Sequence, residues 1–194
     1  LKTTGGSPEP EPSIQLLGTI ASKGTGAQKR LWIAYRQTNT AMTTWNISVA
    51  SSMDAGITWT NPHVFTELSS GTPAFVTYAP QVAIDATGRI TVGWTEGTTN
   101  SDIFVSSSDD QGETWTVPTN LVTLDETIQA VNQTLAALLP VGPAGMSAVW
   151  LDNRSGTSQV LFSRALRMLD SYGLPVEMSL VTAATEPYLD MWKE

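Results

Sequence analysis

The chain has 194 residues, 18 acidic against 10 basic side chains, a formal net charge of −8 and no cysteine. This acidic balance argues against binding to nucleic acid or to anionic membrane surfaces, because both need a basic footprint. Without cysteine, and with His63 as the single histidine, disulfides, thiol catalysis and metal sites of cysteine or histidine are excluded, so we expect no metal and no cofactor.

Residues 1–13 (LKTTGGSPEPEPS) combine Gly and Ser with alternating Glu and Pro, and predict an extended linker. From residue 14 onward, apolar and β-branched residues alternate with polar ones, which is the period-two signature of strands. The first strands are predicted near 14–21, 29–37, 44–51 and 57–66. The octapeptide SMDAGITW, which begins at Ser52, joins the last two.

A second group repeats this organisation. Its strands are predicted near 79–85, 89–96, 102–108 and 114–123. The octapeptide SDDQGETW begins at Ser108 and shares the pattern Ser-x-Asp-x-Gly-x-Thr-Trp with the first. Asp54 and Asp110 lie 56 residues apart, and repeats of this length indicate a propeller or another array of repeated units.

A third group lacks the octapeptide. Its strands are predicted near 133–139, 146–152, 158–166 and 174–182. The second strand of each group carries an aromatic residue at an equivalent place, namely Tyr35, Trp94 and Trp150. Residues 183–194 resemble the segment YAPQVAI that begins at Tyr78, and they predict the first strand of a further group.

The octapeptide resembles the Asp-box, or bacterial neuraminidase repeat, of sialidases and of many non-enzymatic β-propellers. The resemblance implies an all-β fold of four-stranded antiparallel blades, here about three blades plus one extra strand of an incomplete or assembly-completed propeller. This partial sialidase-like propeller would span residues 14–194. Its blades are expected at about 14–66, 79–123 and 133–182, with the start of a further blade at 183–194.

In that family the box is a structural hairpin between the third and fourth strands, remote from the substrate. The residue types agree, because the aspartates can accept hydrogen bonds from the amides that follow them and the glycines supply a positive-φ position. The tryptophans are expected to anchor each hairpin to its own blade. The resemblance thus implies structural roles for Ser52, Asp54, Gly56, Thr58, Trp59, Ser108, Asp110, Gly112, Thr114 and Trp115.

Strand order also predicts where a ligand would bind. In an up-and-down blade, the connection that follows the second strand and the connection to the next blade lie at the end opposite to the boxes. The ligand-binding candidates at that end are Arg36, Tyr78, Glu96, Asp152 and Arg154. Arginines, carboxylates and a tyrosine suit an acidic sugar, since a guanidinium pairs with a carboxylate through two hydrogen bonds.

A plainer interpretation stays open for each candidate. Charged residues at strand ends are usually solvated, which would account for Arg36, Glu96 and Asp152. Arg154 could instead pair with Asp152 and shape a loop. We also expect His63 to be exposed to solvent, because a single histidine can form neither a catalytic triad nor a histidine metal site.

Three functions follow from these residues. Sialidase-type hydrolysis needs the arginine triad and the Arg-Ile-Pro element of that family, which cannot be located, so we predict no catalytic residue and no release of sialic acid by this chain alone. The function that we favour is a non-catalytic module that binds a glycan or a protein. The third is a structural subunit completed by neighbouring copies. A fragment of a sialidase-like glycoside hydrolase is the alternative.

An open arc of blades leaves apolar faces and strand edges that need cover. We expect further blades of a longer protein, because the chain starts at Leu1 without an initiating Met, or other copies in an oligomer or filament. Composition favours an extracellular or cell-surface protein of a prokaryote, with no membrane insertion. Glycosylation at the sequons of Asn46, Asn132 and Asn153 stays open.

Overall fold

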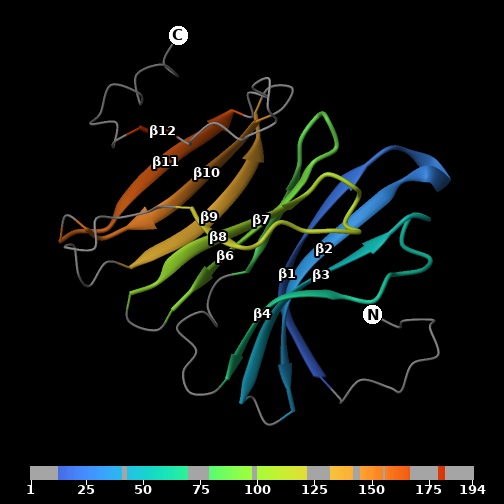
Figure 1. The fold of residues 1–194 in the computed structure, drawn as a ribbon, viewed down its shortest axis with the longest axis horizontal. Coiled ribbons are helices and arrows are strands. Elements are labelled where there is room, and N and C mark those ends of the chain that lie inside the picture. The colour runs from blue at the N-terminus through green and yellow to red at the C-terminus, as the bar shows by residue number, and fades with distance from the viewer. Residues whose placement is uncertain are drawn as a thin grey trace.

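The computed structural model describes residues 13–40, 43–69, 79–97, 100–121, 132–141, 145–154, 156–166 and 179–181. They form three antiparallel sheets of four strands, each in up-and-down order. Figure 1 shows these sheets following one another side by side along the chain, from blue through green to orange. This is the arrangement of consecutive propeller blades, and we call the sheets blade 1, blade 2 and blade 3.

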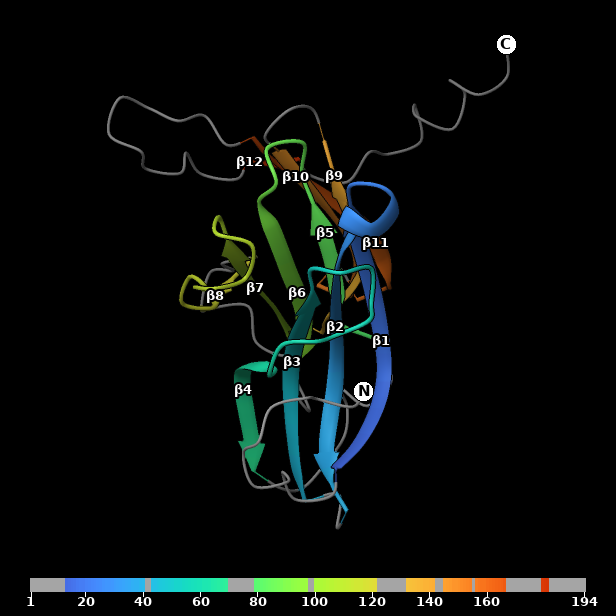
Figure 2. The same ribbon diagram turned by 90° about the vertical axis from the view of Figure 1, so that its right-hand side faces the viewer.

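Each blade runs from an inner first strand to an outer fourth strand. Blade 1 contains β1 (Ser13–Lys23), β2 (Arg30–Asn39), β3 (Thr44–Ser52) and β4 (His63–Ser69), with the short 3-10 helix η1 (Gly26–Gln28) between its first two strands. Blade 2 contains β5 (Gln81–Ile84), β6 (Ile90–Glu96), β7 (Asp102–Ser108) and β8 (Thr119–Asn120). Blade 3 contains β9 (Gln133–Pro140), β10 (Gly145–Asp152), β11 (Gln159–Leu166) and β12 (Ser179–Val181). In Figure 2 the outer strands β4 and β8 lie on one side of the molecule, away from β1 and β5.

Two apolar cores join the blades, and each lies between neighbouring sheets. The core between blades 1 and 2 consists of Trp32, Ala34, Ile47, Val49, Val82, Ile90, Val92 and Trp94. The core between blades 2 and 3 consists of Ala83, Ile103, Leu135, Leu138, Ala148, Trp150 and Leu161. Because successive side chains of a strand point to opposite faces of the sheet, blade 2 contributes to both cores.

Gly93 on β6 permits the close approach of blade 3 to blade 2. A Cβ atom at this position would lie 2.8 Å from Cδ2 of Leu135 and 2.9 Å from Cδ1 of Leu138. Two carbon atoms do not pack at these distances, since their optimal separation is about 3.5 to 4.0 Å. The absence of a side chain at Gly93 therefore lets the leucines of β9 pack directly on β6.

The outer strand of blade 1 begins later than the sequence predicts. β4 begins at His63 and not at residue 57, because the residues between them serve the hairpin loop. The Thr60 amide donates to the carbonyl oxygen of Ser51 at 2.8 Å, and Pro62 then has no N–H to offer to a sheet.

The outer strand of blade 2 is short for the same reason. The sequence predicts residues 114–123, whereas β8 covers only Thr119–Asn120. The Thr116 amide donates to the carbonyl oxygen of Ser107 at 2.9 Å, and Pro118 follows without an N–H. The box loop thus uses backbone groups that a longer strand would need.

Several predicted features lie outside the described residues. They are residues 1–12 of the linker, the strand predicted within 183–194, and the candidate ligand residue Tyr78. In the part of the chain that is described, no helix is long and apolar enough to cross a membrane.

Candidate functional site

The octapeptides form hairpin loops at one end of blades 1 and 2, which we call the box end. In the first loop, Ser52 Oγ and the Thr58 amide both donate to Oδ1 of Asp54 at 2.8 Å, and the Thr58 hydroxyl donates to Oδ2. The Gly56 amide donates to Ser52 Oγ at 2.8 Å. The carboxylate of Asp54 therefore receives its hydrogen bonds from within its own loop.

The second loop repeats these contacts at Ser108, Asp110, Gly112 and Thr114, with the three longer bonds between 2.7 and 2.9 Å. Hydrogen bonds from the hydroxyl and the backbone amide of Thr58 are the main reason that the pKa of Asp54 is lowered to about 2. Those from Thr114 lower the pKa of Asp110 to about 2 in the same way. Both carboxylates stay ionised at neutral pH, so neither is a proton donor for a ligand.

Each loop also contains two consecutive residues in the left-handed region. Gly56 and Gly112 have φ of 92° and 97°, and the residues before them, Ala55 and Gln111, have φ of 60° and 68°. The glycines were expected at positive φ, whereas nothing in the sequence indicates this conformation for Ala55 and Gln111. It presents the carbonyl oxygen of Gln111 to blade 1, where Trp32 Nε1 donates to it at 2.9 Å.

Trp115 also connects the second loop to blade 1. Its indole N–H donates to the carbonyl oxygen of Gly112 at 3.1 Å within its own loop. Its ring stacks on His63 with 5.9 Å between the ring centroids and meets the edge of Phe65 at 4.9 Å. Trp115 therefore bonds within its own loop in blade 2 and, in addition, packs on blade 1, a contact that the sequence did not predict. His63 itself is exposed.

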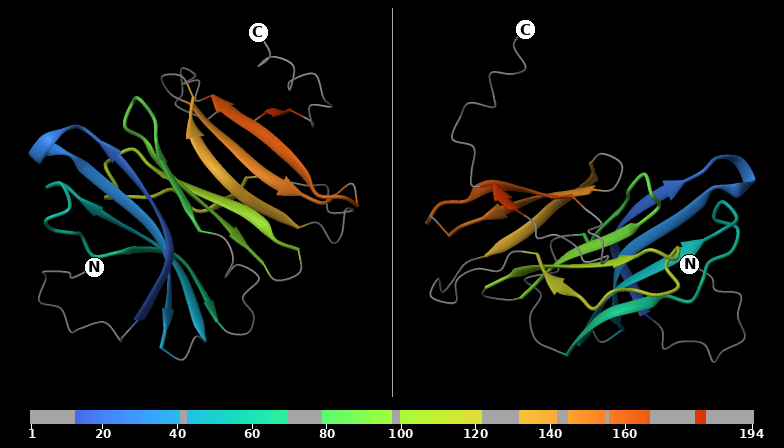
Figure 3. Two further views of the ribbon diagram at one scale, coloured as in Figure 1. Left: turned by 180° about the vertical axis from the view of Figure 1, so that it is seen from behind. Right: turned by 45° about the horizontal axis from the view of Figure 1, so that its top comes forward.

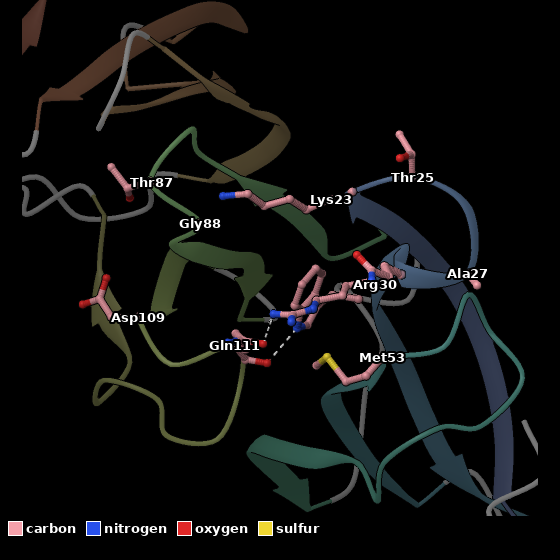
Figure 4. A pocket seen from close by; sticks show the side chains of 12 residues that line it. Lys23, Thr25, Ala27, Arg30, Met53, Thr87, Gly88, Asp109 and Gln111 are labelled. Atoms are coloured by element: carbon pink, nitrogen blue, oxygen red, sulfur yellow. Dashed lines mark hydrogen bonds between the residues drawn. The ribbon is translucent and has the colours of Figure 1, made fainter.

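A depression of about 740 Å³ lies at the box end between blades 1 and 2, and Figure 4 shows it. Lys23 and Arg30 from blade 1 line it together with Asp109 and Gln111 from blade 2. Lys23 Nζ donates to the carbonyl oxygen of Ala86 at 3.2 Å, and Arg30 donates to the side-chain oxygen of Gln111. Lys23, Arg30 and Gln111 are therefore already used to join the two blades, and the sequence did not predict this junction.

The candidate ligand residues lie at the opposite end of the blades, where β2, β6 and β10 finish, and we call this the mouth end. Blades 2 and 3 repeat one contact there. Trp94 Nε1 donates to Glu96 Oε2 at 3.0 Å, and Trp150 Nε1 donates to Asp152 Oδ2 at 3.3 Å. Blade 1 has Tyr35 at the equivalent aromatic position, and burial raises its pKa to about 12.

Asp152 and Arg154 form an ion pair at the mouth end of blade 3. The backbone amide and Nε of Arg154 both donate to Asp152 Oδ1 at 2.9 Å, and Nη2 donates to Oδ2. Burial opposes ionisation of Asp152, yet the hydrogen bonds from Arg154 and Trp150 outweigh it and hold the pKa of Asp152 below its ordinary value. The same pairing raises the pKa of Arg154. Asp152 is 1% exposed, whereas the Arg154 side chain is 22% exposed.

Arg36 and Asp152 are not solvated strand ends, which corrects the plainer interpretation of both residues. Arg36 is 2% exposed and lies on the face of β2 that also carries Ala34, which packs against blade 2. Burial lowers the pKa of Arg36 to about 10. The neighbouring blade covers this face, and a single strand pattern cannot show that. Glu96 is half-buried, closer to the expected solvated end.

Gln133 is a site residue that the sequence analysis missed. It pairs in register with Asp152 and is fully buried. The backbone N–H of Gln133 donates to the backbone carbonyl oxygen of Ser101, and Ser101 Oγ donates to the backbone carbonyl oxygen of Gln133, both at 2.8 Å. Among the described residues, neither Oε1 nor Nε2 of its side chain has a hydrogen-bond partner. The available signal was a polar residue at the start of an apolar strand.

The structure therefore brings together Asp152, Arg154 and Gln133 in blade 3. It places Glu96 with Trp94 in blade 2 and Arg36 inside the junction of blades 1 and 2. No group of three acidic or histidine side chains that could hold a metal ion occurs in the described ranges.

Neither a protein-family model nor a curated protein sequence matches the chain. Solved structures are similar. An α-L-arabinanase of Penicillium chrysogenum, complexed with arabinobiose, matches with a TM-score of 0.52 and 14% identity, over 79% of this chain and 46% of the arabinanase. An N-acetylgalactosamine deacetylase from F. plautii, in complex with blood group B trisaccharide, matches with a TM-score of 0.45 and 12% identity, over 81% and 51% of the two chains. The chain spans about half the length of these proteins, and the likeness to the arabinanase shows the β-propeller fold.

Proposed function

We propose that the chain forms part of a β-propeller that binds carbohydrate at the mouth end without cleaving it. The observation that carries the proposal is the Asp152–Arg154 pair, whose arginine side chain is 22% exposed at the mouth end while the carboxylate that holds it is buried. The buried carboxylate fixes the position of the guanidinium, and the fully buried Gln133 pairs in register beside it. Sugar hydroxyl groups, which accept as well as donate hydrogen bonds, suit the exposed guanidinium.

The charges of this group favour a neutral sugar over the acidic sugar expected from the sequence. Asp152 and Arg154 together carry no net charge. The guanidinium already donates through Nε and Nη2 to Asp152, so its positive charge is neutralised and only the fork of Nη1 and the second Nη2 hydrogen is left for a ligand. The arabinanase of similar fold was solved with a neutral sugar, arabinobiose, which supports this ligand class.

Binding without hydrolysis follows from the state of Asp152. A glycosidase needs one carboxylic acid whose raised pKa lets it protonate the leaving group. The pKa of Asp152 is instead lowered by Arg154 and Trp150, so this residue stays ionised and orients the arginine. We further propose kinship with the Asp-box propellers, because both octapeptides close through the same hydrogen bonds.

Isothermal titration with arabino-oligosaccharides tests this function, with sialyllactose as the acidic comparison. We expect Asp152→Asn to weaken binding of the neutral sugar about tenfold, since a hydrogen bond to a charged group contributes about 1.5 to 3 kcal/mol. Asp110→Asn, at the box end, is the matched control and should leave binding unchanged. Preference for sialyllactose, or equal binding by Asp152→Asn, contradicts the proposed site. Release of reducing sugar contradicts the absence of catalysis.

A further inference from the structure

Equivalent positions of the three blades differ in exposure on one face. In each blade, the residue that follows the equivalent aromatic residue of the second strand pairs with an apolar residue of the third strand. These third-strand partners are Ile47 in blade 1, Ile103 in blade 2 and Val160 in blade 3. Ile47 is 4% exposed and Ile103 is 0% exposed, whereas Val160 is 65% exposed. The same place in the repeat is thus closed in blades 1 and 2 and open in blade 3.

The following blade closes this place, and its first strand takes part in both cases. Val82 on β5 shares a core with Ile47 of blade 1. Leu135 and Leu138 on β9 share a core with Ile103 of blade 2. The first strand of the following blade lies against the preceding sheet: β5 contacts β1 and β2 of blade 1, and β9 contacts β5, β6 and β7 of blade 2.

Blade 3 offers an apolar patch at the places that a following inner strand would contact. The patch, which we call the blade 3 patch, consists of Leu139 on β9, Leu151 on β10, and Val160 and Phe162 on β11, which are 55%, 40%, 65% and 44% exposed. Their register places them on one face. Figure 3 shows blade 2 on the other side of blade 3, so among the described residues this face has no sheet against it. Four large apolar side chains on one surface mark an interaction site.

We infer that the chain's own C-terminal segment, within residues 182–194, forms the inner strand that covers the blade 3 patch. The repeat length supports this occupant. The inner strands β5 and β9 begin 52 residues apart, at Gln81 and Gln133, and the same interval from Gln133 falls at residue 185. The last described strand, β12, ends at Val181, directly before this segment.

The order of residues in the segment also fits. Pro187-Tyr188-Leu189-Asp190-Met191 parallels Pro80-Gln81-Val82-Ala83-Ile84. Val82 faces blade 1, whereas Ala83 belongs to the core with blade 3. By the same alternation, Leu189 and Met191 face the blade 3 patch and Asp190 faces away. This inference is independent of carbohydrate binding at the mouth end.

The absence of cysteine from the chain allows a labelling test in the polypeptide that carries this sequence. The reporter is Val160→Cys, and Val117→Cys, at an 80% exposed position of blade 2, is the open reference. We expect a maleimide to react with Val160→Cys about tenfold more slowly, because a covered thiol reacts only after local opening. Adding Leu189→Asp should bring its rate to that of the reference. Adding Asp190→Ala should not.

Ile103→Cys, at a fully buried position, is labelled only if the protein unfolds, and it is combined with Leu189→Asp to show that the fold survives. Equal rates for Val160→Cys and Val117→Cys show an uncovered patch and overturn the inference. If Val160→Cys reacts slowly and its rate stays the same after Leu189→Asp is added, another occupant covers the patch, and this result also overturns the inference. If its protection then falls on dilution of the protein, that occupant is a second copy of the chain.

Discussion

The box end and the mouth end of the blades use equivalent positions in different ways. At the box end, Asp54 and Asp110 accept the same hydrogen bonds, and the corresponding lengths from the serine and from the threonine amide agree within 0.1 Å. At the mouth end, the residues two positions after the equivalent aromatics are Gln37, Glu96 and Asp152. Of these, Asp152 forms an ion pair with Arg154, and Glu96 accepts a hydrogen bond from the indole N–H of Trp94.

This difference is the one expected between a structural hairpin at the box end and the proposed binding site at the mouth end. A hairpin turn has the same requirements in every blade, so the same side chains recur and keep their hydrogen bonds to themselves. A ligand surface collects different groups from neighbouring blades, so its residues differ from one blade to the next. The following predictions test whether the two ends can be separated in this way.

The largest effect is expected from Asp152→Ala. The change leaves the Trp150 indole N–H and the Arg154 guanidinium without their acceptor, and an unsatisfied buried donor costs about 1 to 3 kcal/mol. Because Arg154 keeps some contact with solvent, we expect the free energy of unfolding to fall by about 2 kcal/mol, together with carbohydrate binding. Urea denaturation and titration measure the two effects, and a loss below about 0.5 kcal/mol would contradict the role of the pair.

Asp54→Ala and Asp110→Ala should each lower the melting temperature by a similar amount, because the two aspartates accept the same set of hydrogen bonds. Neither change should alter carbohydrate binding, since both loops lie at the box end. Differential scanning fluorimetry and titration provide the measurements. A variant that binds less well at an unchanged melting temperature would show that the box end has a ligand role.

The boxes should also make the fold sensitive to acid. Hydrogen bonds from Thr58 and Thr114 lower the pKa of Asp54 and Asp110 from 3.8 to about 2. Their stabilisation is therefore present above about pH 4 and is lost as the pH falls through about 2. The variant with Asp54→Asn and Asp110→Asn together should lose less stability over this interval in acid titrations followed by circular dichroism. An equal loss would assign the acid sensitivity to other carboxylates.

Glu96→Gln should have the smallest effect. The amide oxygen can still accept the indole N–H of Trp94, so the free energy of unfolding should change by less than about 0.5 kcal/mol. If Glu96 faces the ligand, binding should weaken about threefold, since a neutral acceptor forms a weaker hydrogen bond than a carboxylate. Unchanged binding would restrict the site to blade 3.

The repeated octapeptide and the aromatic second strands predicted the blades, because these features depend on local residue patterns. The outer strands were less predictable. Thr60 and Thr116 bind the preceding strand immediately after the box, and that use of the backbone has no local sequence signal. The same holds for the left-handed conformation of Ala55 and Gln111, since neither residue type favours it.

The site was predictable in part. The pairing of Asp152 with Arg154 follows from their spacing in the sequence. The burial of Arg36 and Gln133 does not, because it depends on which face of one blade the next blade covers. Sequence alternation shows that a strand has two faces, but it cannot show what lies against each of them.

The carbonyl oxygen of Gln111, which accepts the Trp32 indole N–H across the junction, has a consequence for cooperativity. The acceptor belongs to a turn of blade 2, whereas the donor is a core residue of blade 1. A local opening of that turn therefore removes a bond from the neighbouring sheet, and blades 1 and 2 should open in hydrogen exchange as a coupled pair rather than as independent units. Gly112→Ala, which would place a carbon atom 3.4 Å from the Trp32 nitrogen, should therefore change hydrogen exchange in blade 1 as well as in blade 2.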